Sequence, residues 1–359
     1  MVEVKNTVTQ EAGPLSQMAG YGHEQVLFCN DKATGLRAII AVHNTVLGPA
    51  LGGTRMWNYS SEADALTDVL RLSRGMTYKA SISNLNLGGG KAVIIGDSRK
   101  DKSEALFRRF GKFVESLGGK YITAEDVGIS PSDMEFVSKE TKSVVGLPGR
   151  SGDPSPVTAF GVYSGIKACL KQRFGSDSLA GKKVSVQGVG HVGYSLVEYL
   201  TKDSAKVFVT DIHEDTLKEV ADKFKATVVK PEEIYDLDVD VYAPCALGAT
   251  VNDHTLPRLK CSIIAGAANN QLKDETVHGK AVMDKGILYA PDFAINAGGL
   301  INCYHEIVGY DRDAAMKQAA GIYDTIATII KTSGDKGIPT YLAANQVAEE
   351  RIRSKGGNI

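Results

Sequence analysis

The feature that most constrains the fold of this chain is a glycine pattern between an apolar run and an amphipathic segment. It follows the run VSVQ and opens a helical pattern through Tyr194 to Leu200. The pattern consists of Gly188, Val189, Gly190, His191, Val192 and Gly193. Such glycines permit a tight turn and let backbone N–H groups approach a pyrophosphate at the positive end of a helix. The pattern therefore predicts a strand, a turn and a helix that bind a dinucleotide.

The same part of the chain contains short apolar runs that alternate with amphipathic segments. The runs are KKVSVQG, KVFVTD, ATVV, VDVYAP, CSIIAGA and GILYAP. Parallel strands joined by crossover helices produce this alternation, because the helices cover both faces of the sheet. We therefore predict a doubly wound parallel sheet of the Rossmann type.

Asp211 ends the second of these runs, eighteen residues after Gly193. A carboxylate there can accept hydrogen bonds from both ribose hydroxyls and repels a 2′-phosphate. Ile212 and His213 follow, so no arginine is at hand to receive such a phosphate. We predict NAD as the cofactor, in preference to NADP. The alternative is a glycine-rich turn in an α/β domain that binds nothing, because this motif alone is a weak signal.

The length of 359 residues predicts two domains rather than one core. Glycines and prolines interrupt every periodicity in GLPGRSGDPSP, residues 146–156. We predict an N-terminal α/β domain over 1–149 and a Rossmann NAD domain over 150–331. The amphipathic C-terminal segment, 332–359, is predicted to pack back on the first domain.

The first domain shows its own mixture of strand and helix patterns. Residues 36–44 and the run KAVIIGD read as strands, as does YIT at 121–123, and glycine and proline predict a loop in LGPALGGTR. One helix is expected from Ser61 and ends before Lys79; another is expected from Ser103. This order favours an α/β domain.

Charge and cysteine content narrow the partners. The chain has 41 basic and 42 acidic residues, a net charge of −1, which gives no electrostatic reason to expect nucleic acid or an anionic membrane surface. Five cysteines without paired spacing argue against a disulfide framework, and no metal-ligand motif is present. No run is apolar enough for a bilayer span. We expect a cytoplasmic protein with small-molecule partners.

Two lysines in the first domain raise the question of chemistry. Lys79 lies twelve positions before Lys91, which follows three glycines and begins an apolar run. A phosphate loop is excluded, because that motif needs glycine where Leu85 stands and Ser or Thr where Ala92 stands. Burial lowers the pKa of a lysine and can make it a base near neutral pH. Lys91 is the better base, and Lys79 the better anchor for a substrate carboxylate.

Asp126, at the end of YITAED, can exchange protons with a substrate amine. Each of these three residues has a simpler interpretation. A lysine at a strand end is commonly a surface residue whose charge reaches water, and Asp126 can cap a helix. Spacing alone does not decide between these interpretations.

Long segments of the chain resemble one enzyme family. LGPALGGTRMW, RGMTYK, LNLGGGKAVIIGD, YITAEDVG, DPSPVTAFGVY, VQGVGHVG, DVYAPCALGATVND, AGAANNQL and YAPDFAINAGGLIN are similar to segments of the leucine, valine and phenylalanine branch of the amino-acid dehydrogenases, in the family's order, from about His23 to about Ile352. The likeness is strongest to the leucine-type members, relatives of glutamate dehydrogenase. It implies a homo-oligomer, an octamer in that family, built through the first domain.

The resemblance also implies roles for individual residues. Lys91 would be the catalytic base, Asp126 would assist proton transfer, and Lys79 would hold the substrate carboxylate beside Gly52 and Gly53. The nicotinamide and its ribose would be surrounded by Thr158, Ala246, Asn269 and Asn296. The substrate side chain would face Leu51, Met76, Ala124, Leu300 and Cys303. For these apolar residues an ordinary place in the core is the alternative. Gly193 stands where alanine is usual, and either residue is expected to suit the helix packing.

The implied reaction is the reversible, NAD-dependent oxidative deamination of an L-amino acid to a 2-oxo acid and ammonia, with L-leucine and other branched-chain amino acids preferred. A phenylalanine or other aromatic amino-acid dehydrogenase is the alternative, because Leu300 and Cys303 leave the pocket size open. A non-catalytic dinucleotide sensor would be expected to lack Lys79, Lys91 or Asp126. A hydroxy-acid dehydrogenase would need a histidine in these segments.

Overall fold

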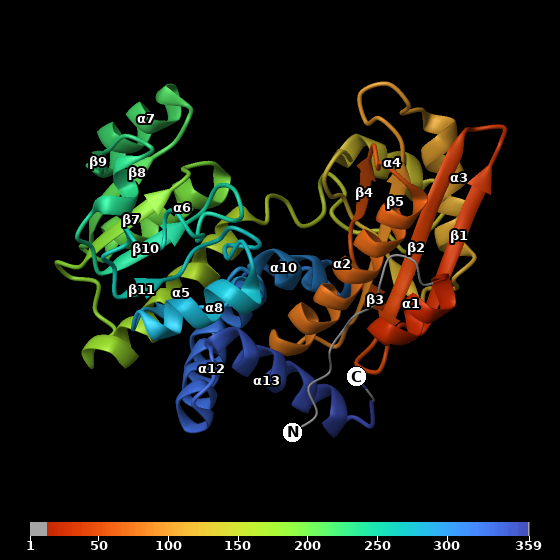
Figure 1. Cartoon of the computed structure of the whole chain (residues 1–359). Helices are drawn as coiled ribbons and strands as arrows, with labels where there is room; N and C mark the ends of the chain where they lie inside the picture. Colours follow the sequence, from red (N-terminus) through yellow and green to blue (C-terminus); the bar gives the residue numbers. More distant parts are fainter. Residues whose placement is uncertain (1–12, 358) are drawn as a thin grey trace. The chain divides into compact units, whose positions relative to one another are not determined.

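The structure, a computed structural model, describes residues 13–357 and 359 and forms two compact units (Figure 1). Unit 1 contains the described residues up to Gly152, together with those of Glu306–Tyr310 and Ala348–Ile359. Unit 2 contains Asp153–His305 and Asp311–Val347. The division after Gly152 falls inside the glycine- and proline-rich segment 146–156. Each unit has its own sheet.

Unit 1 is an α/β unit. Its described elements before the division are α1 Pro14–Tyr21, β1 Gln25–Asp31, β2 Leu36–Asn44, β3 Ala50–Leu51, β4 Thr54–Trp57, α2 Glu62–Ile82, β5 Gly88–Ile95, α3 Glu104–Glu115, β6 Tyr121–Ile122 and α4 Pro131–Ser138. The sheet has the order β1-β2-β5-β3-β6, and β4 pairs with β5 off this path. Strand β5 is antiparallel to β2 and parallel to both β3 and β4.

Helices cover both faces of this sheet. Neighbouring residues of a strand point to opposite faces, so successive residues of β5 contact different helices. Val93 of β5 packs in a buried cluster with Val69 and Leu70 of α2. Ile94, the next residue, packs in a second cluster with Phe107 and Phe110 of α3. Strand β5 therefore packs against α2 on one face and α3 on the other, and it lies in the middle of the sheet.

Several predicted elements of unit 1 are confirmed, and three details are wrong. The segment LGPALGGTR, predicted as a loop, contains β3 and the start of β4, because its backbone pairs with β5. The strand 36–44 is present, and Ser61 and Ser103 are the N-caps of α2 and α3. However, α2 continues to Ile82, so Lys79 lies in its last turn rather than after it. Strand β5 begins at Gly88, so Lys91 lies within the strand and not at its start. Backbone pairing with β2 and β3 overrides the low strand propensity of glycine.

Unit 2 begins with a long helix and continues with alternating strands and helices. Its described elements are α5 Ser155–Phe174, β7 Lys183–Gln187, α6 His191–Lys202, β8 Lys206–Thr210, α7 Glu214–Phe224, β9 Thr227–Val228, the 3₁₀-helix η1 Glu233–Asp236, β10 Val241–Pro244, β11 Ile263–Ile264, α8 Glu275–Asp284, β12 Leu288–Tyr289, α9 Asp292–Ile295, α11 Arg312–Ala320 and α12 Ile322–Lys336. Helices α10, Gly298–Val308, and α13, Thr340–Ser354, each have residues in both units.

The sheet of unit 2 has the order β12-β11-β10-β7-β8-β9, and each neighbouring pair is parallel. Each of its strands lies in one of the apolar runs singled out in the sequence. The strand order reverses between β7 and β10, as in a doubly wound sheet. The prediction of a Rossmann-type fold is confirmed.

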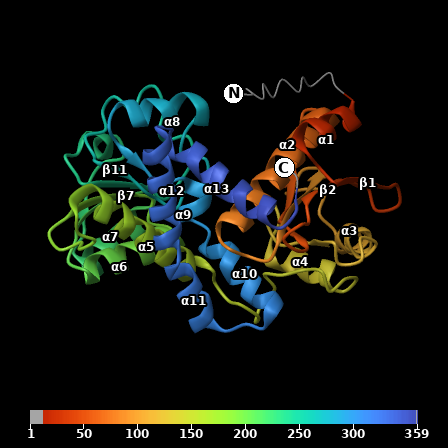
Figure 2. The same ribbon diagram turned by 90° about the horizontal axis from the view of Figure 1, so that it is seen from below.

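The predicted place of the C-terminal segment needs a correction. Residues 332–347 belong to unit 2, and the part assigned to unit 1 is limited to Ala348–Ile359. Residues of α12 belong to unit 2 because this helix packs along α5 (Figure 2). A Cβ on Gly161 would lie 2.5 Å from Ile322, and one on Gly165 would lie 3.4 Å from Ile326. The missing side chains of α5 therefore let α12 approach it closely.

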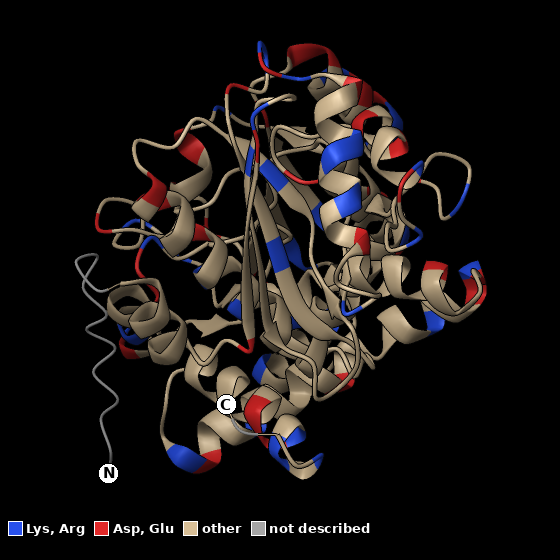
Figure 3. Ribbon diagram, turned by 90° about the vertical axis from the view of Figure 1, so that its right-hand side faces the viewer, with Lys and Arg blue, Asp and Glu red and all other residues tan. Residues whose placement is uncertain are grey.

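Charged side chains lie mainly on helices and loops. Figure 3 shows Lys and Arg residues interspersed with Asp and Glu residues along these helices and loops. Within residues 13–357, no helix has both the length and the apolar character that a membrane span requires. The mixture of both signs agrees with the near-zero net charge of the sequence.

Candidate active site

Glycines allow close backbone packing at and beside β5 in unit 1. A Cβ on Gly52 would lie 1.7 Å from the carbonyl oxygen of Gly90, and a Cβ on Gly89 would lie 2.1 Å from the backbone nitrogen of Thr77. A Cβ on Gly53 would lie 2.4 Å from the carbonyl oxygen of Glu125. No real side chain tolerates such distances, so glycine at these positions allows the segments to pack around Lys91.

Lys91 is buried in β5 and forms an ion pair with Asp126. Its Nζ lies 2.9 Å from Oδ2 of Asp126, and 8% of the lysine side chain is exposed against 27% of the aspartate side chain. Burial lowers the pKa of Lys91, although the Asp126 carboxylate acts in the opposite direction. The pair therefore joins a dehydrated amine to a carboxylate that solvent can partly reach.

The carboxylate of Asp126 is strongly held in its ionised form. Burial acts to raise its pKa, but the Lys91 ammonium and the Arg55 guanidinium outweigh burial and hold the pKa below its usual range. The Arg55 Nε donates to Asp126 Oδ2 over 3.1 Å. Asp126 follows β6 and faces solvent in part, rather than capping a described helix, so its side chain is available for chemistry.

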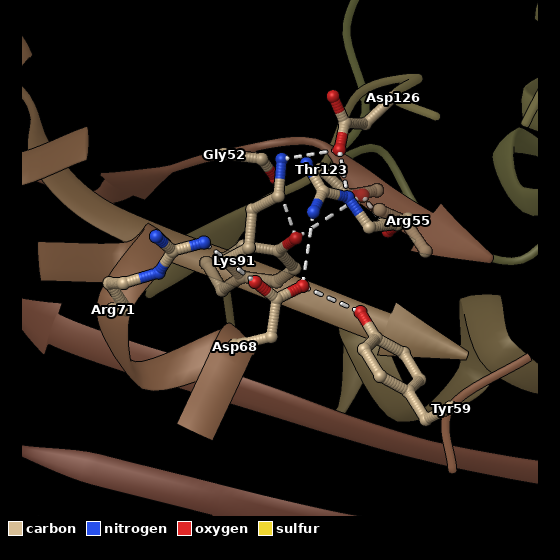
Figure 4. A network of polar contacts seen from close by, with 10 residues as sticks. Gly52, Arg55, Tyr59, Asp68, Arg71, Lys91, Thr123 and Asp126 are labelled. Atoms are coloured by element: carbon tan, nitrogen blue, oxygen red, sulfur yellow. Dashed lines mark hydrogen bonds and ion pairs between the residues drawn. The ribbon is translucent and has the colours of Figure 1, made fainter. Parts of the chain in front are cut away.

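The network extends beyond the predicted residues (Figure 4). Arg55 Nη1 lies 3.0 Å from Oδ2 of Asp68, which also accepts a hydrogen bond of 2.7 Å from the Tyr59 hydroxyl. The Arg71 guanidinium lies 3.3 Å from Oδ1 of Asp68. These four residues come from β4, the loop after it and α2, and the sequence analysis did not single them out. A weak signal was available, because Arg55 follows the predicted glycine pair by two residues.

Lys79 and Met76 lie one turn apart on α2, in the same unit as Lys91. Both side chains are partly exposed, so neither is part of the closed core. The Lys79 carbonyl accepts a hydrogen bond of 2.7 Å from the Ser83 hydroxyl, beyond the helix end. Lys79 therefore lies in the last turn of α2, where the helix ends at Ile82.

Leu51, Gly52, Gly53 and Ala124 lie in two adjoining segments of unit 1. The Gly52 N–H donates to Ile122, and the Thr54 N–H donates 2.8 Å to the Ala124 carbonyl. Leu51 is 2% exposed, whereas Ala124 is partly exposed. The structure therefore brings these predicted residues together with the segment that carries Asp126.

In unit 2 the predicted dinucleotide motif has the expected local form. Gly188 follows β7 with φ of 99°, a conformation that favours glycine, and Gly190 is the N-cap of α6 without a side-chain cap. Nothing lies within 4 Å of a Cβ placed on Gly190, so there is open space beside the N-terminus of α6. One expectation is wrong: a Cβ on Gly193 would lie 2.0 Å from the Gly188 carbonyl oxygen, so alanine does not fit this backbone without a shift.

Asp211 lies directly after β8, beside this turn. Its Oδ2 accepts a hydrogen bond of 2.7 Å from the Val189 N–H, and its Oδ1 accepts one of 3.0 Å from the His213 N–H. Val189 is buried, whereas His191 and Val192 at the start of α6 are exposed or partly exposed. The carboxylate is therefore oriented by backbone donors at the edge of the motif.

The other predicted cofactor residues follow the carboxyl ends of neighbouring parallel strands or lie beside one of them. Ala246 follows β10 and is the residue that a Cβ on Gly188 would meet, at 2.5 Å. Asn296 Nδ2 donates to Asn269 Oδ1 over 2.7 Å and to the Ala267 carbonyl. Thr158 of α5 donates to the Pro154 carbonyl. Carboxyl ends of parallel strands share one sheet edge, where doubly wound folds bind ligands.

Leu300 and Cys303, the remaining predicted pocket residues, lie on α10 in unit 2. They are one turn apart, so they share a face of the helix. Leu300 is buried and Cys303 is partly exposed. The five residues predicted to face the substrate side chain are therefore divided between the units, three in unit 1 and these two in unit 2.

A Rossmann unit with this glycine turn, joined to a unit with a buried lysine and aspartate pair, defines the class of two-domain dehydrogenases. No group of three or more metal-binding side chains occurs within the residues that the structure describes.

The comparisons with known proteins identify the family. The chain matches the models of the Glu/Leu/Phe/Val dehydrogenase dimerisation domain over residues 23–143 and of the glutamate/leucine/phenylalanine/valine dehydrogenases over residues 208–355. The chain belongs to this family of amino-acid dehydrogenases and is an oxidoreductase. The resemblance stated from the sequence is confirmed.

Individual relatives match along most of the chain. Leucine dehydrogenase of Thermoactinomyces intermedius is 56% identical over 93% of this chain and 92% of that protein. The crystal structure of L-tryptophan dehydrogenase from Nostoc punctiforme has a TM-score of 0.89 and 50% identity, over 96% of this chain and 99% of that one. A glutamate dehydrogenase of Thermus thermophilus, at 20% identity and a TM-score of 0.74 over 96% of this chain and 92% of that one, shares the fold.

Proposed function

We propose that this protein catalyses the reversible, NAD-dependent oxidative deamination of L-leucine and other branched-chain L-amino acids to 2-oxo acids and ammonia. The observation that carries the proposal is the buried Lys91, paired with Asp126, in a member of the amino-acid dehydrogenase family. The leucine dehydrogenase relative, similar over almost the whole chain, supports the choice of substrate.

Lys91 and Asp126 are the proposed catalytic residues. A lysine with a lowered pKa can be neutral and take a proton from the water that adds to the imine of the substrate. Asp126, which is partly exposed beside it, exchanges protons with the substrate nitrogen as ammonia leaves. Both roles require the distance of 2.9 Å between the two side chains to be kept.

Lys79, Gly52 and Gly53 are proposed to bind the substrate carboxylate. A cation anchors the charge, and backbone without side chains allows the carboxylate to approach. The side chain of the substrate would contact the divided apolar set, which consists of Leu51, Met76, Ala124, Leu300 and Cys303. One methylene changes discrimination by only about 1 to 3 kcal/mol, so leucine, isoleucine and valine are all expected to react.

NAD is the proposed cofactor, and the residues present fit it. The N-terminus of α6 offers N–H groups to a pyrophosphate, and its N-cap, Gly190, has no side chain and nothing within 4 Å of its Cβ position. Asp211 is oriented for ribose hydroxyls and disfavours a 2′-phosphate. Thr158, Ala246, Asn269 and Asn296 are proposed to lie around the nicotinamide ribose. When bound, NAD accepts the α-hydride of the amino acid.

An aromatic substrate is the alternative, supported by the tryptophan dehydrogenase relative at 50% identity. The first experiment is therefore NADH formation from NAD with L-leucine, L-isoleucine, L-valine, L-phenylalanine, L-tryptophan and L-glutamate, compared by kcat/KM. Aliphatic preference is expected. Aromatic preference would overturn the substrate assignment but keep the mechanism, and absence of turnover with every amino acid would overturn the catalytic role.

We further propose that the chain assembles into a homo-octamer in the cytoplasm. The matched dimerisation domain supports self-association, and five cysteines that form no disulfide support a reducing compartment. Light scattering of the purified protein tests the assembly: a mass of eight subunits, each of 38.3 kDa, is expected, and a smaller particle would contradict it.

A further inference from the structure

Arg55 joins the catalytic pair to a second carboxylate. Its Nε contacts Asp126 at 3.1 Å, and its Nη1 contacts Asp68 at 3.0 Å. The Tyr59 hydroxyl and the Arg71 guanidinium also contact Asp68, which fixes the far end of the chain of contacts. Figure 4 shows Lys91 and Arg55 converging on the Asp126 carboxylate. Asp126 is therefore shared by two cations.

These two cations differ in a way that matters for proton transfer. A lysine that acts as a base must lose its charge, whereas a guanidinium stays protonated at any working pH. If Lys91 were the sole partner of Asp126, neutral Lys91 would leave a half-buried carboxylate without a counter-charge, which is costly. The Lys91 proton would then be retained. A permanent cation on Asp126 removes that penalty.

We propose that Arg55 is a positioning residue that keeps Asp126 ionised and in place while Lys91 is neutral, and that Asp68 and Tyr59 hold Arg55 in that position. The proposal rests on the proposed role of Lys91 as the base. Arg55 acts through Asp126 and Lys91 and is given no contact with the substrate.

Several ionisable groups surround the Lys91 and Asp126 pair and influence the pKa of Lys91. The groups on the packed elements are Arg55 of β4, Tyr59 of the following loop, Asp68, Arg71 and Lys79 of α2, Tyr121 of β6, and Glu125 and Asp126 after β6. Arg55 acts to lower the pKa of Lys91, and Asp68 acts to raise it. Removal of Arg55 and removal of Asp68 should therefore shift the activity in opposite directions.

The test is the pH profile of kcat/KM for L-leucine with NAD. In Arg55→Gln the acid limb should move to higher pH, with kcat/KM falling roughly tenfold at the wild-type midpoint and less at the alkaline plateau. Arg55→Lys keeps a cation and should move the limb back toward the wild-type position. The matched control is Arg108→Gln, because Arg108 pairs with Glu140 in the same unit without touching this network. Its limb should not move.

A folded Arg55→Gln with a wild-type acid limb would overturn the proposal. If Arg55→Gln does not fold, Asp68→Asn decides, because the amide oxygen of asparagine still accepts from Arg55 while the negative charge is lost. With Arg55 held in place, a shift of the limb to lower pH supports the proposal, and an unchanged or upward limb contradicts it. Labelling of the Lys91 amine with trace acetic anhydride across pH, quantified by peptide mass spectrometry, needs no turnover. If the proposed function is wrong, the wild-type protein will be inactive. If only this inference is wrong, the wild type and Arg55→Gln will give the same pH profile of Lys91 labelling.

Discussion

The replacement Lys91→Ala provides the most direct test of the proposed chemistry. Lys91 is 6% exposed and contacts Asp126 at 2.9 Å, so alanine removes the base without opening another route for the proton. General-base catalysis contributes about 10² to 10⁴ in rate, and each tenfold corresponds to 1.36 kcal/mol. The expected loss of transition-state stabilisation is therefore about 3 to 5 kcal/mol.

The structure also predicts that this variant folds. Breaking a buried ion pair commonly costs about 3 to 5 kcal/mol, because the remaining charge has no partner. Here Asp126 keeps Arg55 at 3.1 Å, so the loss of stability should be below that range. The variant should consequently lose turnover without losing its fold.

The assay is steady-state NADH formation with L-leucine, combined with calorimetric titration of NAD. NAD affinity should stay nearly unchanged, because the dinucleotide motif lies in unit 2 and Lys91 lies in unit 1. Lys112→Ala, at an exposed lysine of α3, serves as the control. The reasoning would be refuted by a variant whose kcat/KM stays within about tenfold of the wild-type value.

Further predictions concern the cofactor, the glycines and two histidines of unit 1, one buried and one partly buried. Asp211→Ala should weaken NAD binding and narrow its advantage over NADP, whereas an unchanged ratio of kcat/KM for the two cofactors would remove that role. Gly52→Ala should destabilise the fold by several kcal/mol in urea unfolding, on the order of the overpacking costs in a tight core, because its Cβ would lie 1.7 Å from a backbone oxygen. Burial lowers the pKa of His23 to about 3 and that of His43 to about 4. The unfolded chain therefore binds protons below pH 6.5 that the folded chain refuses, and the free energy of unfolding should fall as pH decreases from 6.5 toward 4. An NMR titration in which these two rings titrate near 6.5 would contradict this last prediction.

Local patterns were sufficient to predict the sheet of unit 2 and its glycine turn. Apolar runs, glycine at a turn and an acid after the second strand all act over a few residues, and each corresponds to an observed feature. The early part of unit 1 was harder. Gly88, Gly89 and Gly90 suggest a loop, yet they form a strand because β2, β3 and α2 pack against them. Tertiary packing there overrides local preference.

The contacts around the catalytic pair could not be read from sequence spacing. Arg55 contacts Asp68, which is 13 residues away in the sequence, and Asp126, which is 71 residues away. A helix and two strand pairings bring these residues together. The hydrophobic periodicity of the sequence does not indicate contacts between residues so far apart. Besides the place of Arg55 after the glycine pair, Asp68 itself was a signal, because it is an acid beside Val69 and Leu70 on a helix that faces the core. A half-buried acid on such a face implies a cation nearby.

The position of Lys91 within a strand, and not at its mouth, has a chemical consequence. A lysine at the strand end could reach water, and its pKa would stay near the ordinary value. In the middle of β5 its ammonium is dehydrated, and the absence of side chains at Gly52, Gly53 and Gly90 brings backbone and the Asp126 segment close to it. The glycines therefore supply more than conformational freedom. They contribute to the dehydration that suits the lysine to its proposed role as a base, and they allow the close approach of Asp126.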